Sequence, residues 1–225
     1  MKANLTRAAL LGATLVAVGL AAGQAAQAET AVQVAQASAP ARPASATPEQ
    51  VVEELHARLL DVMRGAKELG FDGRRRALEP ILRSAYNLAG MARVAAGRHW
   101  EAMSGEQQAA LVDGFSRMTF ATYADRFSGF SGEHFKTLGQ RQGPAGASIV
   151  DTQIVKASGE AVAISYLLQQ RDGAWRIADV HLKGGISELA TRRAEYVAVL
   201  DREGVPGLLA ALKQKVERIE RERSG

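Results

Sequence analysis

The sequence contains no cysteine. A thiol nucleophile, a disulfide framework and a cysteine-ligated metal site are therefore excluded. Stability has to come from a hydrophobic core, and roughly 175 residues are available for a single domain after the N-terminal region. Beyond that region, no apolar run is long enough to cross a bilayer as a helix.

The sequence also lacks the common motifs of catalysis and nucleotide binding. It has no phosphate-binding loop, no G-x-G-x-x-G, no G-x-S-x-G, no His-Glu-x-x-His and no calcium-binding loop. Its four histidines are scattered. The spacing Glu53-x-x-His56 occurs once, although a carboxylate-bridged di-iron site needs two such copies. We therefore expect neither a metal nor a cofactor.

An export signal opens the chain. Lys2 and Arg7 precede an uncharged apolar run over 8–22, and the small-x-small sequence Ala26-Gln27-Ala28 follows. This is the pattern of a cleavable secretory signal peptide over 1–28. An uncleaved membrane anchor is the alternative, but an apolar run of about 15 residues is short for that purpose. We expect a periplasmic protein.

Two further segments complete the predicted domain organisation. Residues 29–46 are rich in Ala, Gln, Ser and Pro and carry no large apolar side chain, which is typical of a disordered tether. A capping-box sequence at Thr47-Pro48-Glu49-Gln50 then begins the first helix. We predict one folded domain over 47–225.

Positive charge exceeds negative charge only slightly, with a formal net charge of +4. Such a small excess does not indicate a nucleic-acid partner, which an exported protein would rarely meet. Two arginine runs, 74–76 and 192–193, are expected to be solvated faces. The alternative is a docking surface for an anionic membrane or an acidic partner.

Apolar periodicity predicts helices in both halves of the chain. The first runs to about Leu69, and a Gly-Phe-Asp-Gly break at 70–73 separates it from a second helix through Ala85, which Pro80 should kink. Further helices are predicted over 88–96, from a second capping box at Ser104, and over 186–203 and 206–221. The long helix after Ser104 carries one face formed by Leu111, Phe115, Met118, Thr119, Thr122 and Tyr123.

Between these helices the period changes from 3.6 to two, which predicts strands. Four strands are expected, over 134–138, 147–156, around 162–168 and over 175–183, with an Asp-Gly hairpin turn at 172–173. In the last strand the alternation of apolar and polar residues shifts by one position near Asp179. This shift predicts a bulge there, or a strand whose two ends pack against different cores. The order of elements indicates an α+β fold: helices packed on a curved four-stranded antiparallel sheet, a cone that can enclose an apolar cavity.

One pair of residues suggests acid–base chemistry. Asp179 and His181 lie on one face of the last strand, and Tyr166 on the neighbouring strand can join them. The alternative is structural: Asp179 caps or hydrogen-bonds, and His181 faces solvent.

Several segments in order resemble one family. They are Arg76-x-Leu78-x-Pro80-Ile81-Leu82, Tyr86-Asn87-x-x-x-Met91-Ala92, Gly97-Arg98-His99-Trp100, Asp172-Gly173-x-Trp175-Arg176-Ile177-x-Asp179-Val180 and Gly204-x-x-Gly207-Leu208-Leu209. Over roughly 48–215 the sequence resembles the MlaC, or toluene-tolerance, family. The stretches 123–132 and 179–193 are most similar to its hopanoid-associated branch, HpnM. Asn87 departs from the family, which usually carries Asp there.

This resemblance implies an MlaC-like cavity within an NTF2-like cone and a non-enzymatic lipid carrier. The cargo is a phospholipid or hopanoid, exchanged between an inner-membrane lipid transporter and an outer-membrane complex, with transient membrane contact by a monomer. We expect the lipid to contact the inward-facing residues Met91, Phe115, Met118, Tyr123, Ile164, Tyr166, Trp175, Ile177 and Val180. A small cavity enzyme that uses Asp179 and His181, or a periplasmic adaptor with a filled core, are the alternatives.

Overall fold

A computed structural model describes residues 46–182 and 185–224, all within one compact unit, Pro43–Gly225. The predicted signal peptide and nearly all of the predicted tether lie outside these residues. Within the described ranges, no helix is both long and apolar enough to cross a membrane.

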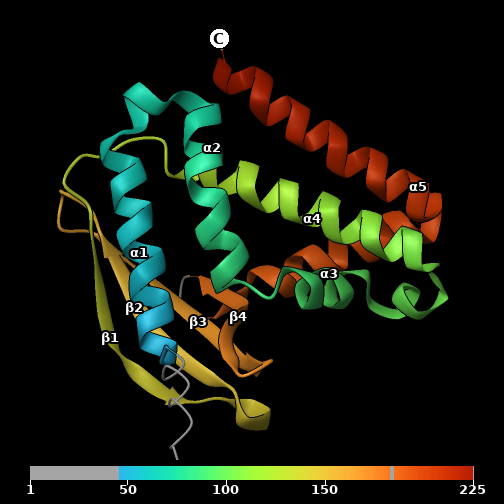
Figure 1. Cartoon of the computed structure of the whole chain (residues 1–225), viewed down its shortest axis with the longest axis horizontal. Helices are drawn as coiled ribbons and strands as arrows, with labels where there is room; N and C mark the ends of the chain where they lie inside the picture. The colour runs from blue at the N-terminus through green and yellow to red at the C-terminus, as the bar shows by residue number, and fades with distance from the viewer. Residues whose placement is uncertain (1–45, 183–184, 225) are drawn as a thin grey trace, which may run out of the picture. The chain divides into compact units, whose positions relative to one another are not determined.

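Helices form both halves of the domain and strands lie between them (Figure 1). The helices are α1 (Pro48–Arg64), α2 (Ala66–Ala85), α3 (Leu88–Ala96), the 3-10 helix η1 (Gly97–Ala102), α4 (Gly105–Arg126), the short η2 (Pro144–Gly146) and α5 (Glu188–Ser224). The strands are β1 (His134–Gln142), β2 (Ser148–Val155), β3 (Ala161–Arg171), β4 (Ala174–Leu182) and β5 (Ile186–Ser187). The α+β prediction is confirmed.

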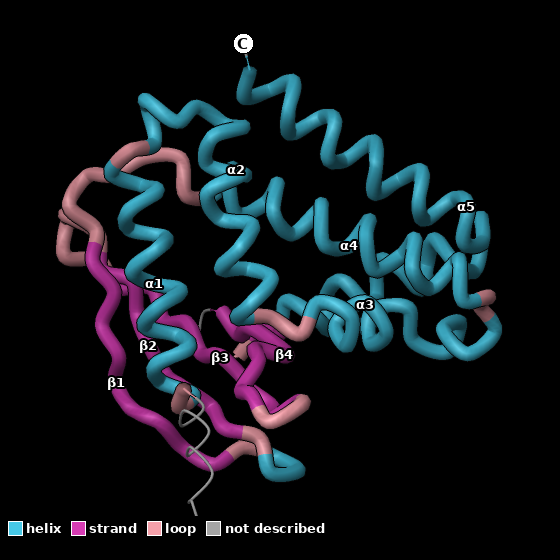
Figure 2. The backbone as a smooth tube through the Cα atoms, in the orientation of Figure 1, coloured by secondary structure: helices cyan, strands magenta, loops and turns pink. Residues whose placement is uncertain are grey.

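The strands form one antiparallel sheet in the order β1-β2-β3-β4-β5 (Figure 2). The sheet has five strands, not the expected four, because Ile186 and Ser187 pair with the end of β4. The predicted hairpin turn is present: Asp172 and Gly173 both have positive φ, at 51° and 78°, as a two-residue hairpin loop requires.

A bulge in β4 explains the parity change in its sequence. Leu167 of β3 lies opposite Asp179, whereas the next residue, Leu168, lies opposite Ile177, so Ala178 is the extra residue. Ile177 before the bulge and Val180 after it therefore both pack against the core. The predicted bulge is confirmed.

Two glycines allow sharp breaks within segments that are otherwise helical. Gly70 interrupts α2 with a φ of 59°, and Gly204 interrupts α5 with a φ of 64°. Such backbone conformations favour glycine, because in any other residue the Cβ atom would crowd its own backbone. The first helix ends at Arg64, earlier than the predicted Leu69, because the chain already turns at Gly65. The predicted break at Gly204 is confirmed.

The core lies between the sheet and the helices. Helix α1 packs against β1 and β2, the start of α5 packs near β4, and α4 lies alongside α5 (Figure 1). Fully buried side chains such as Leu55, Phe115 and Leu168 join the layers. At about 25 cal/mol per Å² of apolar surface removed from water, this burial is the main stabilising term.

Arg74 departs from the expectation that its run is a solvated face. Its side chain is buried, with 6% exposure, whereas Arg76 is exposed. Its Nε donates to the carbonyl oxygen of Ala124 at 2.9 Å, and its Nη1 donates to that of Ala66 at 3.0 Å. Arg74 thus ties the start of α2 to the last turn of α4, where backbone carbonyls lack helical partners.

Candidate functional site

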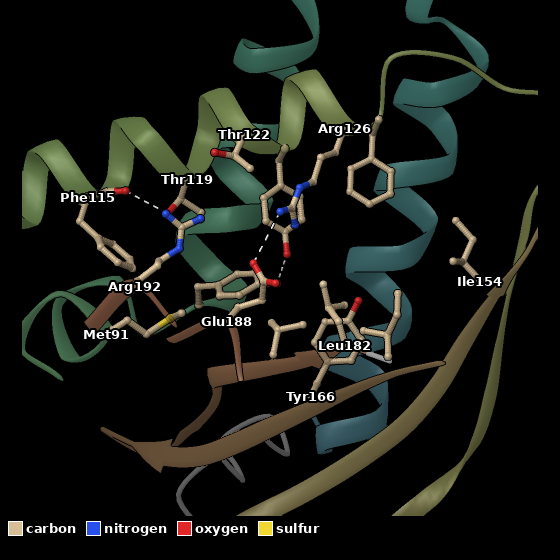
Figure 3. A pocket seen from close by; sticks show the side chains of 15 residues that line it. Met91, Phe115, Thr119, Thr122, Arg126, Ile154, Tyr166, Leu182, Glu188 and Arg192 are labelled. Atoms are coloured by element: carbon tan, nitrogen blue, oxygen red, sulfur yellow. Dashed lines mark hydrogen bonds and ion pairs between the residues drawn. The ribbon is translucent and has the colours of Figure 1, made fainter. Parts of the chain in front are cut away.

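An apolar cavity of about 210 Å³ lies between α4, the start of α5 and the inner face of the sheet (Figure 3). Its walls are mostly aliphatic and aromatic. They consist of Tyr86, Met91, Phe115, Thr119, Thr122, Tyr123, Arg126, Phe127, Ile154, Ile164, Tyr166, Val180, Leu182, Glu188 and Arg192.

Helix α4 supplies one wall because its lining residues recur at helical spacing. Phe115, Thr119, Thr122 and Arg126 are separated by four, three and four residues, so they share one face. The two threonine hydroxyls bond within their own helix, Thr119 to the Phe115 carbonyl at 2.9 Å and Thr122 to that of Met118 at 2.7 Å. Their donor hydrogens are therefore already used within the helix.

The sheet supplies the opposite wall through strand alternation. Ile164 and Tyr166 are alternate residues of β3 and face the same side. The bulge at Ala178 turns Val180 and Leu182 of β4 toward this side too. Without the extra residue, these two side chains would lie on the outer face.

The connection between α2 and α3 places Tyr86 against the cavity, where it pairs with Tyr123 of α4. Tyr86 forms a parallel bridge with Ile177, and the Asn87 N–H donates to the Ile177 carbonyl at 2.9 Å. The Tyr86 hydroxyl is hydrogen-bonded to that of Tyr123, whose ring stacks on Phe127 at 5.6 Å. Burial raises the pKa of Tyr86 and of Tyr123, so both phenols stay neutral.

A buried histidine contacts Tyr166 and holds its hydroxyl by a hydrogen bond. His56 of α1 is 4% exposed, stacks on Phe135 with ring centroids 3.9 Å apart, and hydrogen-bonds the Tyr166 hydroxyl at 3.0 Å. Burial lowers the pKa of His56 to about 4 and raises that of Tyr166 well above its usual range. The pair is therefore neutral at neutral pH, and the cavity wall carries no charge here.

Three ionised side chains interrupt the apolar lining, and we call Arg126, Glu188 and Arg192 the charged rim. An Arg126 nitrogen lies 3.6 Å from a Glu188 carboxylate oxygen, and the two side chains are 53% and 28% exposed. The Arg192 guanidinium lies over the Phe115 ring, 5.8 Å from its centroid. Figure 3 shows all three between the Met91 end and the Leu182 end.

The start of α5 holds two of these groups in place. The Asp179 carboxylate accepts from the Leu189 N–H at 3.1 Å and from the Ser187 hydroxyl at 2.6 Å. The Ser187 hydroxyl oxygen in turn accepts from the Ala190 N–H at 2.8 Å. These bonds satisfy free N–H groups of the first turn, which fixes where Glu188 leaves the helix.

Sequence comparison places this architecture in a family. Residues 53–214 match the profile of a family described as MlaC protein. The chain belongs to the MlaC family. Its residues match no curated protein sequence. A solved structure with a similar fold is the phospholipid-binding protein from Ralstonia solanacearum in complex with a phospholipid, with a TM-score of 0.69 and 19% identity. That match covers 78% of this chain and 99% of the other.

The MlaC fold brings six of the nine predicted site residues to the cavity. They are Met91, Phe115, Tyr123, Ile164, Tyr166 and Val180. The other three lie elsewhere: Met118 and Ile177 are buried in the core, and Trp175 is half-buried and packs against it. Periodicity gives the inward face of an element but does not tell which part of that face borders a cavity.

Sequence reasoning missed nine lining residues of this MlaC cavity. Thr119 and Thr122 lie on the α4 face that was recognised, and Tyr86 lies in a segment that carried the family resemblance. Arg126 continues the same face by one turn, so helical spacing signals it. Arg192 stands in a run that was expected to be solvated. The others are Phe127, Ile154, Leu182 and Glu188.

The predicted acid–base pair lies outside the cavity lining. Asp179 and His181 do approach each other, with Nε2 3.5 Å from Oδ2. However, neither borders the cavity, and the Asp179 carboxylate is occupied by the start of α5. This geometry is that of the structural alternative for Asp179. Among the described residues, no group of three or more His, Asp or Glu side chains is arranged to hold a metal.

Proposed function

We propose that this chain is a periplasmic carrier that binds a membrane lipid, a phospholipid or a hopanoid, in the cavity between α4 and the sheet. It shuttles the lipid as a monomer between an inner-membrane lipid transporter and an outer-membrane complex. The observation that carries the proposal is an apolar cavity whose three ionised groups all come from α4 and α5, in a chain of the MlaC family. The phospholipid bound to the Ralstonia protein of like fold supports it.

The chemistry of the walls suits an acyl chain or a fused-ring lipid. Each methylene moved from water into such a cavity contributes about 0.8 kcal/mol, so a long chain binds firmly without a polar motif. The neutral tyrosines and the buried His56 keep charge away from most of the lining. The charged rim lies where a head group can meet solvent.

The cavity has to widen to hold a whole lipid. An engineered cavity of about 150 Å³ holds one benzene molecule. The 210 Å³ present here accommodates little more than that, so two acyl chains require the helices and the sheet to separate. We therefore propose that loading is accompanied by an opening between α4 and the inner face of β3 and β4.

Native mass spectrometry of the protein, expressed from its full-length gene in a hopanoid-producing host, tests this function. We expect a stoichiometric co-purified lipid, and solvent extraction then identifies it as a phospholipid or a hopanoid. A protein that is empty, and stays empty after incubation with total membrane lipid, would contradict the proposal and favour a periplasmic adaptor with a filled core.

A pair of variants assigns the lipid to this cavity. Ile164→Phe adds a ring to the lining and should lower lipid occupancy. Ala163→Phe adds the same ring to the next residue, which is exposed on the opposite face of β3, and should leave occupancy unchanged. Equal occupancy in the two variants, with both folded by circular dichroism, places the lipid elsewhere.

A further inference from the structure

The charged rim is the only ionised part of the cavity lining within the described residues. Apolar walls bind acyl chains in proportion to buried area and cannot distinguish one head group from another. Any selection among lipids with the same chains therefore depends on Arg126, Glu188 and Arg192, together with the neutral hydroxyls of Tyr86 and Tyr123.

Two guanidinium groups border the cavity on neighbouring helices. Arg126 is in the last turn of α4 and Arg192 is in the second turn of α5. Planar guanidinium groups bind phosphate oxygens with paired hydrogen bonds. Both positive charges act to lower the pKa of the Tyr123 hydroxyl, against the effect of burial, and both side chains border the cavity beside it. A phosphodiester between them neutralises one of the two positive charges.

The carboxylate of Glu188 lies beside this pair and forms an ion pair with Arg126. Its separation of 3.6 Å from Arg126 exceeds hydrogen-bonding distance, and within the described part of the chain no hydrogen bond to its oxygens is present. It precedes Arg192 by one helical turn, so the two side chains leave α5 on the same face. The Glu188 oxygens can therefore accept hydrogen bonds from a positive group attached to the phosphate.

We propose that the charged rim selects a zwitterionic, amine-bearing phospholipid: Arg126 and Arg192 hold the phosphodiester, and Glu188 accepts hydrogen bonds from the ammonium group. With a zwitterionic lipid bound, the rim keeps its one excess positive charge, so the preference rests on the contact between the ammonium group and Glu188 and not on net charge. A glycerol head group satisfies only the arginines. This inference rests on the proposed lipid-binding function and names its substrate class.

The test is competitive loading. The full-length-gene product, stripped of lipid, is incubated with vesicles of equimolar phosphatidylethanolamine and phosphatidylglycerol that carry the same acyl chains, and bound lipid is counted by native mass spectrometry. We expect about a fivefold preference for phosphatidylethanolamine, the size of a partly exposed charge pair. Glu188→Gln should reduce this ratio to about one, whereas Glu195→Gln, which removes an exposed carboxylate from the same helix, should leave it unchanged.

A second set of variants examines the phosphate contacts. Arg126→Gln combined with Arg192→Gln should lower the loading of both phospholipids about tenfold relative to diacylglycerol with the same chains. Arg193→Gln is the matched control, because Arg193 is exposed and does not border the cavity.

The outcomes separate this inference from the function on which it rests. A wild-type protein that takes up neither lipid overturns both. A protein that loads both lipids equally, or that keeps its preference when Glu188 becomes Gln, is a lipid carrier without the head-group selection proposed here. A preference for phosphatidylglycerol overturns the role of Glu188 as well.

Discussion

His56 makes the stability of the domain depend on pH. Its folded-state pKa of about 4 lies below the ordinary value of 6.5, because the imidazole is buried against Phe135 and Tyr166. Between these values the unfolded chain binds more protons than the folded one, so the free energy of unfolding falls as pH decreases from 6.5 to 4. The shift corresponds to about 3 kcal/mol over that interval. Urea unfolding at a series of pH values measures it.

His56→Gln isolates this contribution from that of the carboxylates. The variant cannot take up a proton, so its free energy of unfolding should decline less steeply over the same interval, whatever its stability at pH 7. His99→Gln is a control, since that histidine is partly exposed and pairs with Asp201 near the surface. Parallel pH profiles for wild type and His56→Gln would contradict a neutral buried imidazole.

Arg74 stabilises the domain through hydrogen bonds rather than through surface charge. Arg74→Met keeps much of the aliphatic stem but leaves the carbonyls of Ala124 and Ala66 without their donors. We expect the free energy of unfolding to fall by about 2 kcal/mol, in line with hydrogen bonds made by charged groups. Chemical denaturation should show no comparable loss for Arg76→Met, because that side chain is exposed. Equal losses would show that net charge, not geometry, matters.

The first turn of α5 depends on one carboxylate. Asp179→Ala removes the acceptor of the Leu189 N–H and of the Ser187 hydroxyl, so the helix start should lose about 1 kcal/mol. Because Glu188 leaves this turn and Arg192 follows in the next one, head-group preference in the vesicle assay should weaken too. Asp179→Asn keeps an acceptor and should retain most of both properties. If Asp179→Ala leaves the head-group preference unchanged, the Asp179 cap does not position the charged rim.

Local patterns predicted most of the elements because their causes are local. The two capping boxes and the helix over 88–96 lie where the sequence placed them, since each depends on residues three or four positions apart. The bulge was signalled by the parity change near Asp179. The strand β5 was not predicted, because two residues carry no periodicity and their pairing depends on β4.

The site was less predictable because it depends on contacts between distant segments. Both arginine runs were expected to be solvated, yet Arg74 is buried and Arg192 borders the cavity. Adjacent helical residues point about 100° apart, so a run of arginines necessarily faces several directions. Which member turns inward depends on the partner, α4 in both cases. Met118 and Ile177 do not border the cavity for the same reason, since an inward-facing side chain can pack in the core instead.

In the domain as a whole, the cavity is too small for a two-chain lipid. Its walls belong to different layers, the helices and the sheet. Helix α4 supplies one wall of this cavity, and the paired strands β3 and β4 supply the other. The start of α5 is tied to β4 through β5 and the Asp179 carboxylate. The second half of α5, by contrast, packs on α4 and α2, where Val216 and Ile219 contact Phe71. Opening the cavity therefore requires the sheet and α4 to separate but leaves the packing of that half intact.

Removal of bound lipid should accordingly destabilise one side of the domain more than the other. A ligand present at about 100 times its dissociation constant adds about 2.7 kcal/mol to the folded state, which corresponds to roughly 5–10 °C in Tm for a domain of this size. We expect delipidated protein to melt lower by that amount. Amide hydrogen exchange should rise in α4, β3 and β4 and stay unchanged over 205–224. The Ile164→Phe variant, which should load little lipid, provides the control: its Tm should not change on delipidation. A uniform rise in exchange across the domain would mean that lipid stabilises the fold globally, without an opening between α4 and the sheet.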